Sequence, residues 1–488
     1  MKATLRSAVL LGIAALGMGV ASLPAFAEVQ NVKVSGDVTV RAFHRECLDL
    51  NCGDDNLGST GALGAGKPLE SEDDFFMHTI GVNVAADLTE NVSAFIRLAN
   101  ERDWDSTIGG NAASQDVDLS QGYITLKELF YSPLTLRVGT QPIVWGRGFV
   151  LGSNLLPTIL GRPNDANASI TANEFTDFTS FDALRATLDL SGVTGNLPVT
   201  LDAVYIKLDE NTTTAADDVN LMGVNLGTRF DDTMNSELET YYLNKRDKVA
   251  TSALDPDGRD GSVNTIGLRG SARPVEGSSV WGELAYQFGR RATDFEAILP
   301  SGDSQQAWAA NFGADMTFTD VAMTPKVGAE WKFFSGKDVD TAVMGWHPIA
   351  PGYFTTALRE FQTRSTIAAT RFYPNTQAGV TSGQTNQHEL AVFGSFKPIE
   401  DLTVNQRLSW FVLPVGARLV DTTSGPHRES FLGTEWDTML TYDYTDDVQF
   451  GLIYGLFLPG SVYREDAVGV AAGDDTAQEL ITSVSVKF

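Results

Sequence analysis

The sequence predicts an all-β chain, a transmembrane antiparallel up-and-down β-barrel of about 18 strands. Three observations support this fold class: an N-terminal export signal, apolar and polar residues that alternate along the rest of the chain, and connections that alternate between short and long. Residues 483–488 form one such alternating strand and end on Phe488. An exported chain that ends in an amphipathic strand is expected in a bacterial outer membrane.

The N-terminus has the organisation of a secretory signal peptide. Basic residues precede an apolar run over residues 8–20, and the small-residue site Ala25-Phe26-Ala27 follows. No other stretch approaches the roughly 18 consecutive apolar residues that a membrane helix needs. We therefore expect a signal peptide over residues 1–27 and a single barrel domain over residues 28–488.

Composition agrees with a barrel better than with a helical membrane protein. Mean hydropathy is −0.08 and aromatic residues make up 10% of the chain. An alternating strand exposes a continuous apolar face to lipid although its average hydropathy is low. No linker, low-complexity tract or shift in composition divides the chain, which favours one closed sheet over several soluble domains.

The strands are predicted from this alternation. In residues 184–190, leucine and alanine alternate with Arg185, Thr187 and Asp189, so one side suits lipid and the other water. The predicted strands begin at about Val32, Phe75, Val92, Val117, Leu134, Asp182, Val199, Val219, Glu237, Val263, Ser279, Gln306, Pro325, His388, Leu402, Gly433, Val448 and Leu480.

The connections place one end of the barrel in the periplasm, because bacterial barrels have short periplasmic turns and long external loops. Short turns are expected at residues 89–91, 232–234, 398–401 and 445–447. Long connections are expected at about 44–73, 146–181, 246–262, 291–305, 336–387, 413–432 and 459–479. Those at 146–181 and 336–387 are rich in apolar residues, so we expect both to fold into the barrel and constrict it.

Charged residues are predicted to line the pore, and the two signs are nearly balanced there. The formal net charge of the chain is −27, but most of the surplus acid lies in the predicted loops. The basic residues on the predicted inward face are Arg97, Arg137, Arg185, Arg229, Arg269, Lys332 and Arg407. The acidic residues on this face are Asp189, Glu283, Asp315, Glu330, Glu389, Glu435 and Asp437.

Two external loops contain residues that suggest covalent or metal chemistry. Cys47 and Cys52 are the only cysteines, and export makes a local disulfide the expected state, with a metal site that includes His44 as the alternative. Asp255, Asp257 and Asp260 lie in a Gly-rich segment that suits a structural calcium ion, although the spacing departs from the standard calcium loop. No other cofactor is expected.

Catalytic motifs are not found. The chain has no Gly-x-Ser-x-Gly elbow, and its five histidines have no recognisable serine partner in the sequence. A Ser–His pair on the outer surface of the barrel remains the alternative. We therefore expect a protein that is not an enzyme.

Two parts of the sequence resemble the alginate-export family of outer-membrane barrels. They are residues 138–146, which read VGTQPIVWG, and, more clearly, Leu432-Gly433-Thr434-Glu435-Trp436-Asp437 together with residues 455–460. The resemblance implies a monomeric barrel that moves polysaccharide or small solutes by diffusion. Thr140 stands where the family pattern usually has arginine, which favours a general porin over an exporter of polyanions.

The sequence therefore predicts a passive channel for small solutes or saccharides. One alternative is an exporter of an acidic polysaccharide such as alginate, with a continuous basic track through Arg137, Arg185, Arg229, Arg269 and Arg407. Another is a surface adhesin or scaffold whose barrel is plugged by a loop. The expected partners are outer-membrane lipid, lipopolysaccharide and the transported solute, with no nucleic acid, and the expected state is a monomer.

Overall fold

The computed structural model describes most of the chain after the predicted signal peptide. The described residues are 31–48, 50, 72–104, 117–130, 133–154, 172–195, 197–209, 218–248, 260–291, 304–336, 343–362, 384–421, 425–463 and 475–488. Within these ranges, no helix has the length and apolar character needed to cross a membrane. The predicted signal peptide lies outside the described residues.

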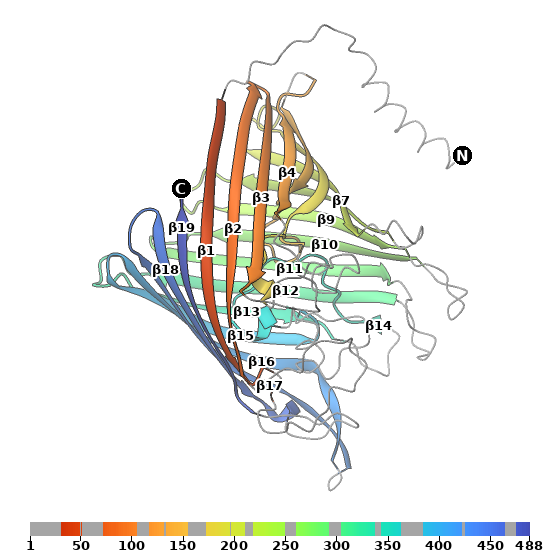
Figure 1. The fold of residues 1–488 in the computed structure, drawn as a ribbon. Helices are drawn as coiled ribbons and strands as arrows, with labels where there is room; N and C mark the ends of the chain where they lie inside the picture. Colours follow the sequence, from red (N-terminus) through yellow and green to blue (C-terminus); the bar gives the residue numbers. More distant parts are fainter. Residues whose placement is uncertain are drawn as a thin grey trace, which may run out of the picture.

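Eighteen strands of the described residues form a closed antiparallel barrel (Figure 1), and the two-residue strand β14 (Val343–Met344), between β13 and β15 in the chain, pairs in parallel with β12. The strands are β1 (Asn31–Glu46), β2 (Glu72–Thr89), β3 (Val92–Asp103), β4 (Asp118–Leu126), β5 (Leu134–Gln141), β6 (Phe181–Asp189), β7 (Val199–Asp209), β8 (Val219–Arg229), β9 (Glu237–Asp247), β10 (Gly261–Ala272), β11 (Ser278–Arg290), β12 (Ser304–Thr317), β13 (Lys326–Phe334), β15 (Gln387–Ile399), β16 (Leu402–Asp421), β17 (Gly425–Asp443), β18 (Val448–Pro459) and β19 (Ala477–Lys487). Each strand pairs with the next, and β1 pairs with β19 from Asp37–Lys487 to Glu46–Gln478, which closes the ring.

Alternation of apolar and polar residues gives the barrel its two faces. On β10, Ile266 and Leu268 are 49% and 54% exposed, whereas Thr265 and Arg269, which flank them, are buried. The same pattern on the other strands makes an outward apolar belt, the surface that a lipid bilayer covers. The predicted fold class is confirmed.

The predicted strand positions are confirmed within three residues, with one exception. The connection expected at residues 413–432 is instead part of a long hairpin, because β16 extends to Asp421 and β17 begins at Gly425 rather than at Gly433. Pro414 and Gly416 interrupt the alternation in the sequence, and the pairing of β16 with β17 is irregular between Phe411 and Ala417. Because of this irregularity, the alternation of apolar and polar residues in the sequence did not indicate that the strands continue here.

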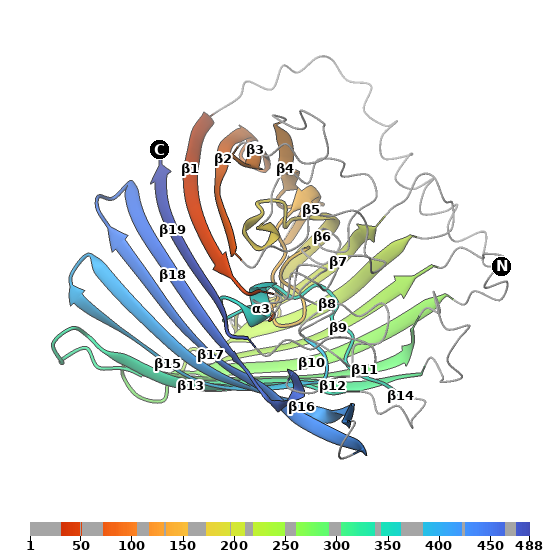
Figure 2. The ribbon, with the colours of Figure 1, turned by 60° about the horizontal axis from the view of Figure 1, so that its bottom comes forward.

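The four predicted short turns are confirmed, and they lie at the same end of the barrel as the start of β1 and the end of β19 (Figure 1). Two long connections run into the barrel. The first inner loop joins β5 to β6 and is described for residues 142–154 and 172–180. The second inner loop joins β13 to β15 and is described for residues 335–336, 343–362 and 384–386. Figure 2 shows helix α3 (Arg359–Gln362) of the second inner loop inside the ring of strands.

The core of the molecule lies inside the barrel, between these loops and the wall. Trp145, Phe149 and Leu151 of the first inner loop, and Trp346 and Ile349 of the second, are almost fully buried. They share one apolar cluster with inward side chains from β6 to β13. Both loops thus bury aromatic side chains that would otherwise be exposed, which confirms the expectation that they fold into the barrel.

Candidate functional site: the barrel lumen

The two inner loops pair with each other inside the barrel. Leu151 forms an isolated parallel bridge with Ala350, the Gly152 amide donates to the Ala350 carbonyl at 2.7 Å, and the Gly352 amide donates to the Gly148 carbonyl at 2.8 Å. A Cβ on Gly352 would lie only 2.7 Å from the carbonyl carbon of Gly152, so the backbones can approach this closely only with glycine. We call residues 148–152 with 350–352 the loop crossing.

Wall residues hold the first inner loop in place. The indole N–H of Trp145 donates to Asp202 on β7 at 2.9 Å, and the Gly146 amide donates to Glu239 on β9 at 3.0 Å. Both acceptors face inward and both also contact arginines of the wall. The loop therefore depends on the same carboxylates that balance the wall arginines.

A buried ionic cluster holds the second inner loop against β13, β15 and β16. Lys332 Nζ lies 2.7 Å from a carboxylate oxygen of Glu360, next to the start of α3, and 3.1 Å from one of Glu389. Arg407 Nη2 lies 2.6 Å from Glu389 and 2.9 Å from Glu330. We call these five residues the ionic cluster. Each charge has a partner of opposite sign, as buried charges require.

Two further wall carboxylates bind the backbone of the same loop. Glu435 on β17 accepts the amides of Leu358 at 2.6 Å and Arg359 at 2.9 Å, and Asp437 accepts the amide of Ala357 at 3.2 Å. Both side chains are buried. Their role in the structure is therefore to position the loop within the barrel.

All fourteen residues predicted to line the pore lie at inward positions of their strands, and most have a partner in the wall or in a loop. Arg97 contacts Asp37 and Asp177, Arg185 contacts Asp202, Arg229 contacts Glu237, Arg269 contacts Glu239, Asp315 contacts Lys326, and Glu283 accepts a hydrogen bond from Tyr241. Asp189 is exposed at the end of β6, where it accepts the Ser191 amide.

Arg137 differs from the other predicted arginines. Within the described ranges, no carboxylate forms an ion pair with it; its guanidinium carbon lies 4.6 Å from the ring centre of Tyr123, and its Nε donates to Thr125 at 3.3 Å. The residue directly opposite on β6 is Arg185, another cation. Because Arg185 is itself paired with Asp202, the positive charge left without an acidic partner at this part of the described wall is that of Arg137.

Sequence reasoning missed Arg147. Its guanidinium lies over Trp281 at 4.2 Å and over Tyr353 at 4.7 Å, and its Nη2 donates to the Tyr353 hydroxyl at 2.5 Å. It therefore links both inner loops to β11. Its place between Gly146 and Gly148 in an aromatic loop was the one signal that could have identified it.

The predicted disulfide and calcium site are only partly described. Cys47 is buried after the end of β1, while Cys52 lies outside the described residues, so their pairing stays a prediction. Asp255 and Asp257 also lie outside them, and Asp260 is exposed before β10. His44, Glu72 and Asp74 bring one potential ligand atom each within 4.8 Å of one another on the external rim, a geometry that could hold a cation.

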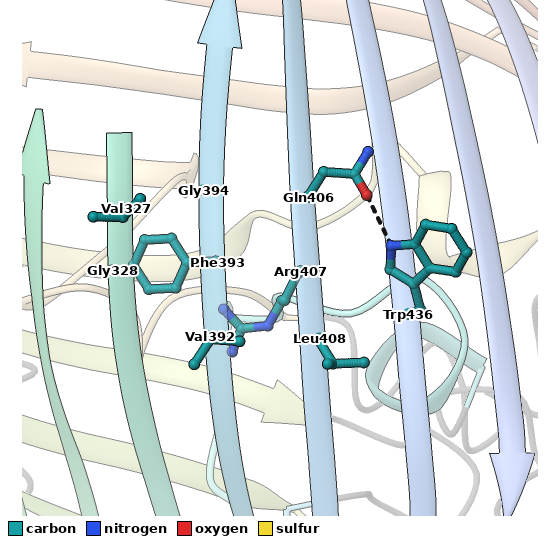
Figure 3. A pocket seen from close by; sticks show the side chains of 9 residues that line it. All are labelled: Val327, Gly328, Val392, Phe393, Gly394, Gln406, Arg407, Leu408 and Trp436. Carbon is teal, nitrogen blue, oxygen red and sulfur yellow. Dashed lines mark hydrogen bonds between the residues drawn. The ribbon is translucent and has the colours of Figure 1, made fainter. Parts of the chain in front are cut away.

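A hollow of about 580 Å³ lies on the outer wall over β13 and β15 to β17 (Figure 3). Its outward side chains include Val327, Val392 and Trp436, each about half exposed, and the Trp436 indole donates to Gln406 at 2.8 Å. These apolar residues belong to the lipid-facing belt. The hollow is therefore not part of a path for polar solutes.

Solved structures similar in fold are outer-membrane porins. OccK2 (OpdF) of Pseudomonas aeruginosa, in complex with glucuronate, is 12% identical over 94% of this chain and 98% of its own, with a TM-score of 0.51. OpdQ of the same organism (13% identity; 94% and 98% covered) and OccAB4 of Acinetobacter baumannii (10% identity; 95% and 100% covered) each give a TM-score of 0.49.

At the level of sequence, a search of curated proteins found no match. The family model described as "Alginate export" matches residues 59–477, which is most of the chain. The chain belongs to the alginate export family and is a channel of the bacterial outer membrane.

Proposed function

We propose that this channel conducts small solutes, including small saccharides, by passive diffusion and excludes polymers. The observation that supports this proposal is the loop crossing, in which two loops from different parts of the wall meet inside the lumen. A barrel of about 18 strands would otherwise enclose a wide aqueous channel. Loops anchored by buried contacts narrow such a lumen to gaps that suit small molecules.

Selection in this proposal combines size with charge. The ionic cluster and the paired arginines contribute little net field, because each cation lies beside a carboxylate. Arg137 is the exception, so its positive charge is available to a passing solute. A solute is thus sieved by the loops and sorted weakly by charge, without any covalent step.

Export of an acidic polysaccharide is the second candidate, and the family match favours it. It would require a continuous basic track through Arg137, Arg185, Arg229, Arg269 and Arg407. Four of these five arginines are paired with carboxylates, which leaves no continuous row of free cations for a polyanion to follow. This pairing supports the small-solute proposal over the exporter.

The adhesin or scaffold alternative draws support from the same inner loops, because they occupy part of the barrel. It differs from a channel in one measurable respect: a scaffold conducts nothing.

The proposal also includes the partners and the oligomeric state. The apolar outward face supports binding of lipid and lipopolysaccharide to the outer belt, and the family resemblance supports a monomer.

Liposome swelling tests the proposed solute range. Liposomes that contain the refolded mature chain should swell quickly in monosaccharides, more slowly in disaccharides and hardly at all in long oligosaccharides. Liposomes with the same lipid and a heat-denatured sample are the control. Equal rates for all sizes would contradict a constriction by the loops, and uptake of long uronate polymers would instead favour the exporter.

A further inference from the structure

One histidine and three carboxylates meet on the outer side of the barrel, where β1 ends and β2 begins. His44 lies opposite Asp74 in the register of these two neighbouring strands, and Glu46 lies opposite Glu72 (Figure 1). The four positions alternate with inward ones such as the buried Phe43, so they face outward. The short turns lie at the other end of the barrel, which places these side chains at the external rim. We call them the rim cluster.

The two nitrogens of His44 face different partners. Nδ1 is 2.7 Å from Asp74 Oδ1 and 3.9 Å from Glu72 Oε1, whereas Nε2 is 3.2 Å from Glu46 Oε1. A histidine that binds a metal through one nitrogen usually donates the N–H of the other to a carboxylate or carbonyl, which orients the ring. In the rim cluster, Nδ1 is placed as the ligand and Glu46 as the acceptor that orients the imidazole.

The distances suit a metal ion between His44, Glu72 and Asp74. One ligand atom from each of these residues lies within 4.8 Å of the other two. Ligand atoms of a tetrahedral zinc site lie roughly 3–3.5 Å apart, since each bond is about 2 Å long. Glu72 and Asp74 are 60% and 65% exposed, so their side chains have room for the small rotations that this geometry requires.

Negative charge is in excess at the rim cluster. In the part of the chain that the structure describes, the ion pairs of Glu46, Glu72 and Asp74 are all formed with His44. Glu46 and Glu72 also lie directly opposite each other, an arrangement of like charges that destabilises a sheet. On its other side, Glu46 lies opposite the neutral Gln478 of β19. One imidazole, even when protonated, cannot balance three carboxylates, whereas a bound divalent cation removes most of this repulsion.

The types of ligand atom distinguish between classes of metal. Ca²⁺ and Mg²⁺ prefer oxygen ligands alone, whereas an imidazole nitrogen suits Zn²⁺, Cu²⁺ and Ni²⁺. Zn²⁺ accepts histidine nitrogen and carboxylate oxygen in the same site. A nitrogen atom beside two carboxylate oxygens therefore favours a first-row transition metal over an alkaline-earth ion.

We propose that the rim cluster binds a divalent transition-metal ion such as Zn²⁺, with His44, Glu72 and Asp74 as its ligands. Glu46 is a positioning residue that orients the imidazole. The ion links the end of β1 to the start of β2, the two strand ends between which residues 47–71 run. The inference stands apart from the conduction of solutes, because the site lies on the outer side of the wall.

The test is calorimetric titration of the refolded mature chain with Zn²⁺. The protein carries no histidine tag, and the pH is about 7.5, where an unperturbed imidazole is mostly neutral. Wild type should bind a single Zn²⁺ ion, and His44→Gln should weaken binding at least about tenfold, because loss of even an outer partner of a ligand costs roughly 10–100-fold. Asp74→Asn should weaken binding as well. His388→Gln is the matched control, since that outward histidine lies beside Trp331 and Phe333 rather than carboxylates.

Two further measurements locate the ion. Hydrogen exchange in peptides that contain the end of β1 and the start of β2 should slow when Zn²⁺ is added to wild type, because a link between strand ends opposes fraying. The same peptides of His44→Gln should show no change. Samples in which a thiol reagent finds no free thiol exclude Cys47 and Cys52 as the ligands.

The outcomes separate the metal site from the channel. Equal Zn²⁺ affinity in wild type and His44→Gln would overturn the site. Binding of Ca²⁺ as tight as that of Zn²⁺ would also overturn it, because the imidazole would then have no part in the binding. A barrel that conducts but binds no Zn²⁺ would overturn the metal site alone, and a silent barrel that binds Zn²⁺ would contradict the channel alone.

Discussion

Charged side chains are buried and paired in the wall from β13 to β17, but they are arranged differently in the wall from β4 to β6. In the first, Lys332 and Arg407 are buried and each lies beside two carboxylates of the ionic cluster. In the second, Arg137 lies against Tyr123 and Thr125, opposite another arginine. Dry, paired charges fix a loop in place, whereas a charge without an acidic partner can act on a solute. A lumen that is balanced in total can therefore still be selective at one place.

The largest effect should follow from breaking the ionic cluster. Lys332→Met leaves Glu360 and Glu389 buried beside one fewer cation, and should lower the free energy of unfolding by about 3–5 kcal/mol. Urea unfolding in detergent micelles, followed by the electrophoretic shift of the folded barrel, measures this loss.

Lys326→Met is the matched control for that experiment, because Lys326 pairs with Asp315 at a more exposed position and should cost less than about 1 kcal/mol. Adding Glu360→Gln to Lys332→Met should recover part of the stability, since it removes one of the stranded charges. Similar losses for Lys332→Met and Lys326→Met would mean that the cluster does not anchor the loop.

Disruption of the loop crossing should have a smaller effect on stability and a clear effect on current. In Gly352→Val the new side chain collides with Gly152, which should cost about 1–3 kcal/mol and separate the two inner loops. Thermal unfolding measures the cost, and the altered conductance reports the separation. Gly192→Ala is the control, because nothing lies within 4 Å of the added methyl group there. Unchanged conductance in Gly352→Val would show that the loop crossing does not constrict the path of the solute.

Neutralising Arg137, which has no acidic partner among the residues that the structure describes, tests the comparison between the two walls. Arg137→Gln should shift selectivity toward cations by roughly threefold to fivefold, since one charge at the wall of an aqueous path contributes about 1 kcal/mol. Reversal potential under a salt gradient measures this change. Arg229→Gln removes an arginine that is paired with Glu237, so it is the comparison variant. Equal shifts for both variants would show that pairing does not decide selectivity.

The smallest effect concerns Asp232 in the short turn between β8 and β9, which belongs to neither wall. It accepts the amides of Ser236 and Met234, and these hydrogen bonds, those of Ser236 first, lower its pKa below the ordinary 3.8. Its contribution to stability is therefore present above the unfolded pKa and is lost as the pH falls through the lower folded pKa. An NMR titration, with Asp232→Asn to assign the signal, should place its midpoint below 3.8; a midpoint at or above 3.8 would remove this contribution.

The strands of the wall and the facing of their side chains could be predicted from the sequence, because every strand of a barrel alternates between an inward and an outward side chain. Alternation placed Arg137, Arg269 and Glu435 on the inward face, since a strand alternates its side chains whatever it contacts. The rule failed at residues 413–432, where Pro414 and Gly416 break the pattern although the chain continues as a strand.

The lumen was less predictable, because its contacts join residues far apart in the chain. Arg147 contacts Tyr353 only because two loops meet, and His347 lies between Lys245 and Arg291 only because the second inner loop folds onto β9 and β11. Apolar residues in both loops predicted that they would be sheltered, but no periodic pattern indicates where a loop docks. The pair of Lys332 with Glu360 followed from that docking, whereas pairs such as Arg229 with Glu237 join neighbouring strands of the wall.

The most direct test of the account is the single-channel conductance of the refolded mature chain in a planar bilayer under a salt gradient. A narrow channel with mostly paired charges and one arginine without an acidic partner among the described residues should give discrete, steady openings with a small reversal potential of the sign that a preference for anions gives. A barrel shown to be folded by its resistance to detergent, yet silent over repeated insertions, would contradict the channel and favour a scaffold plugged by its inner loops.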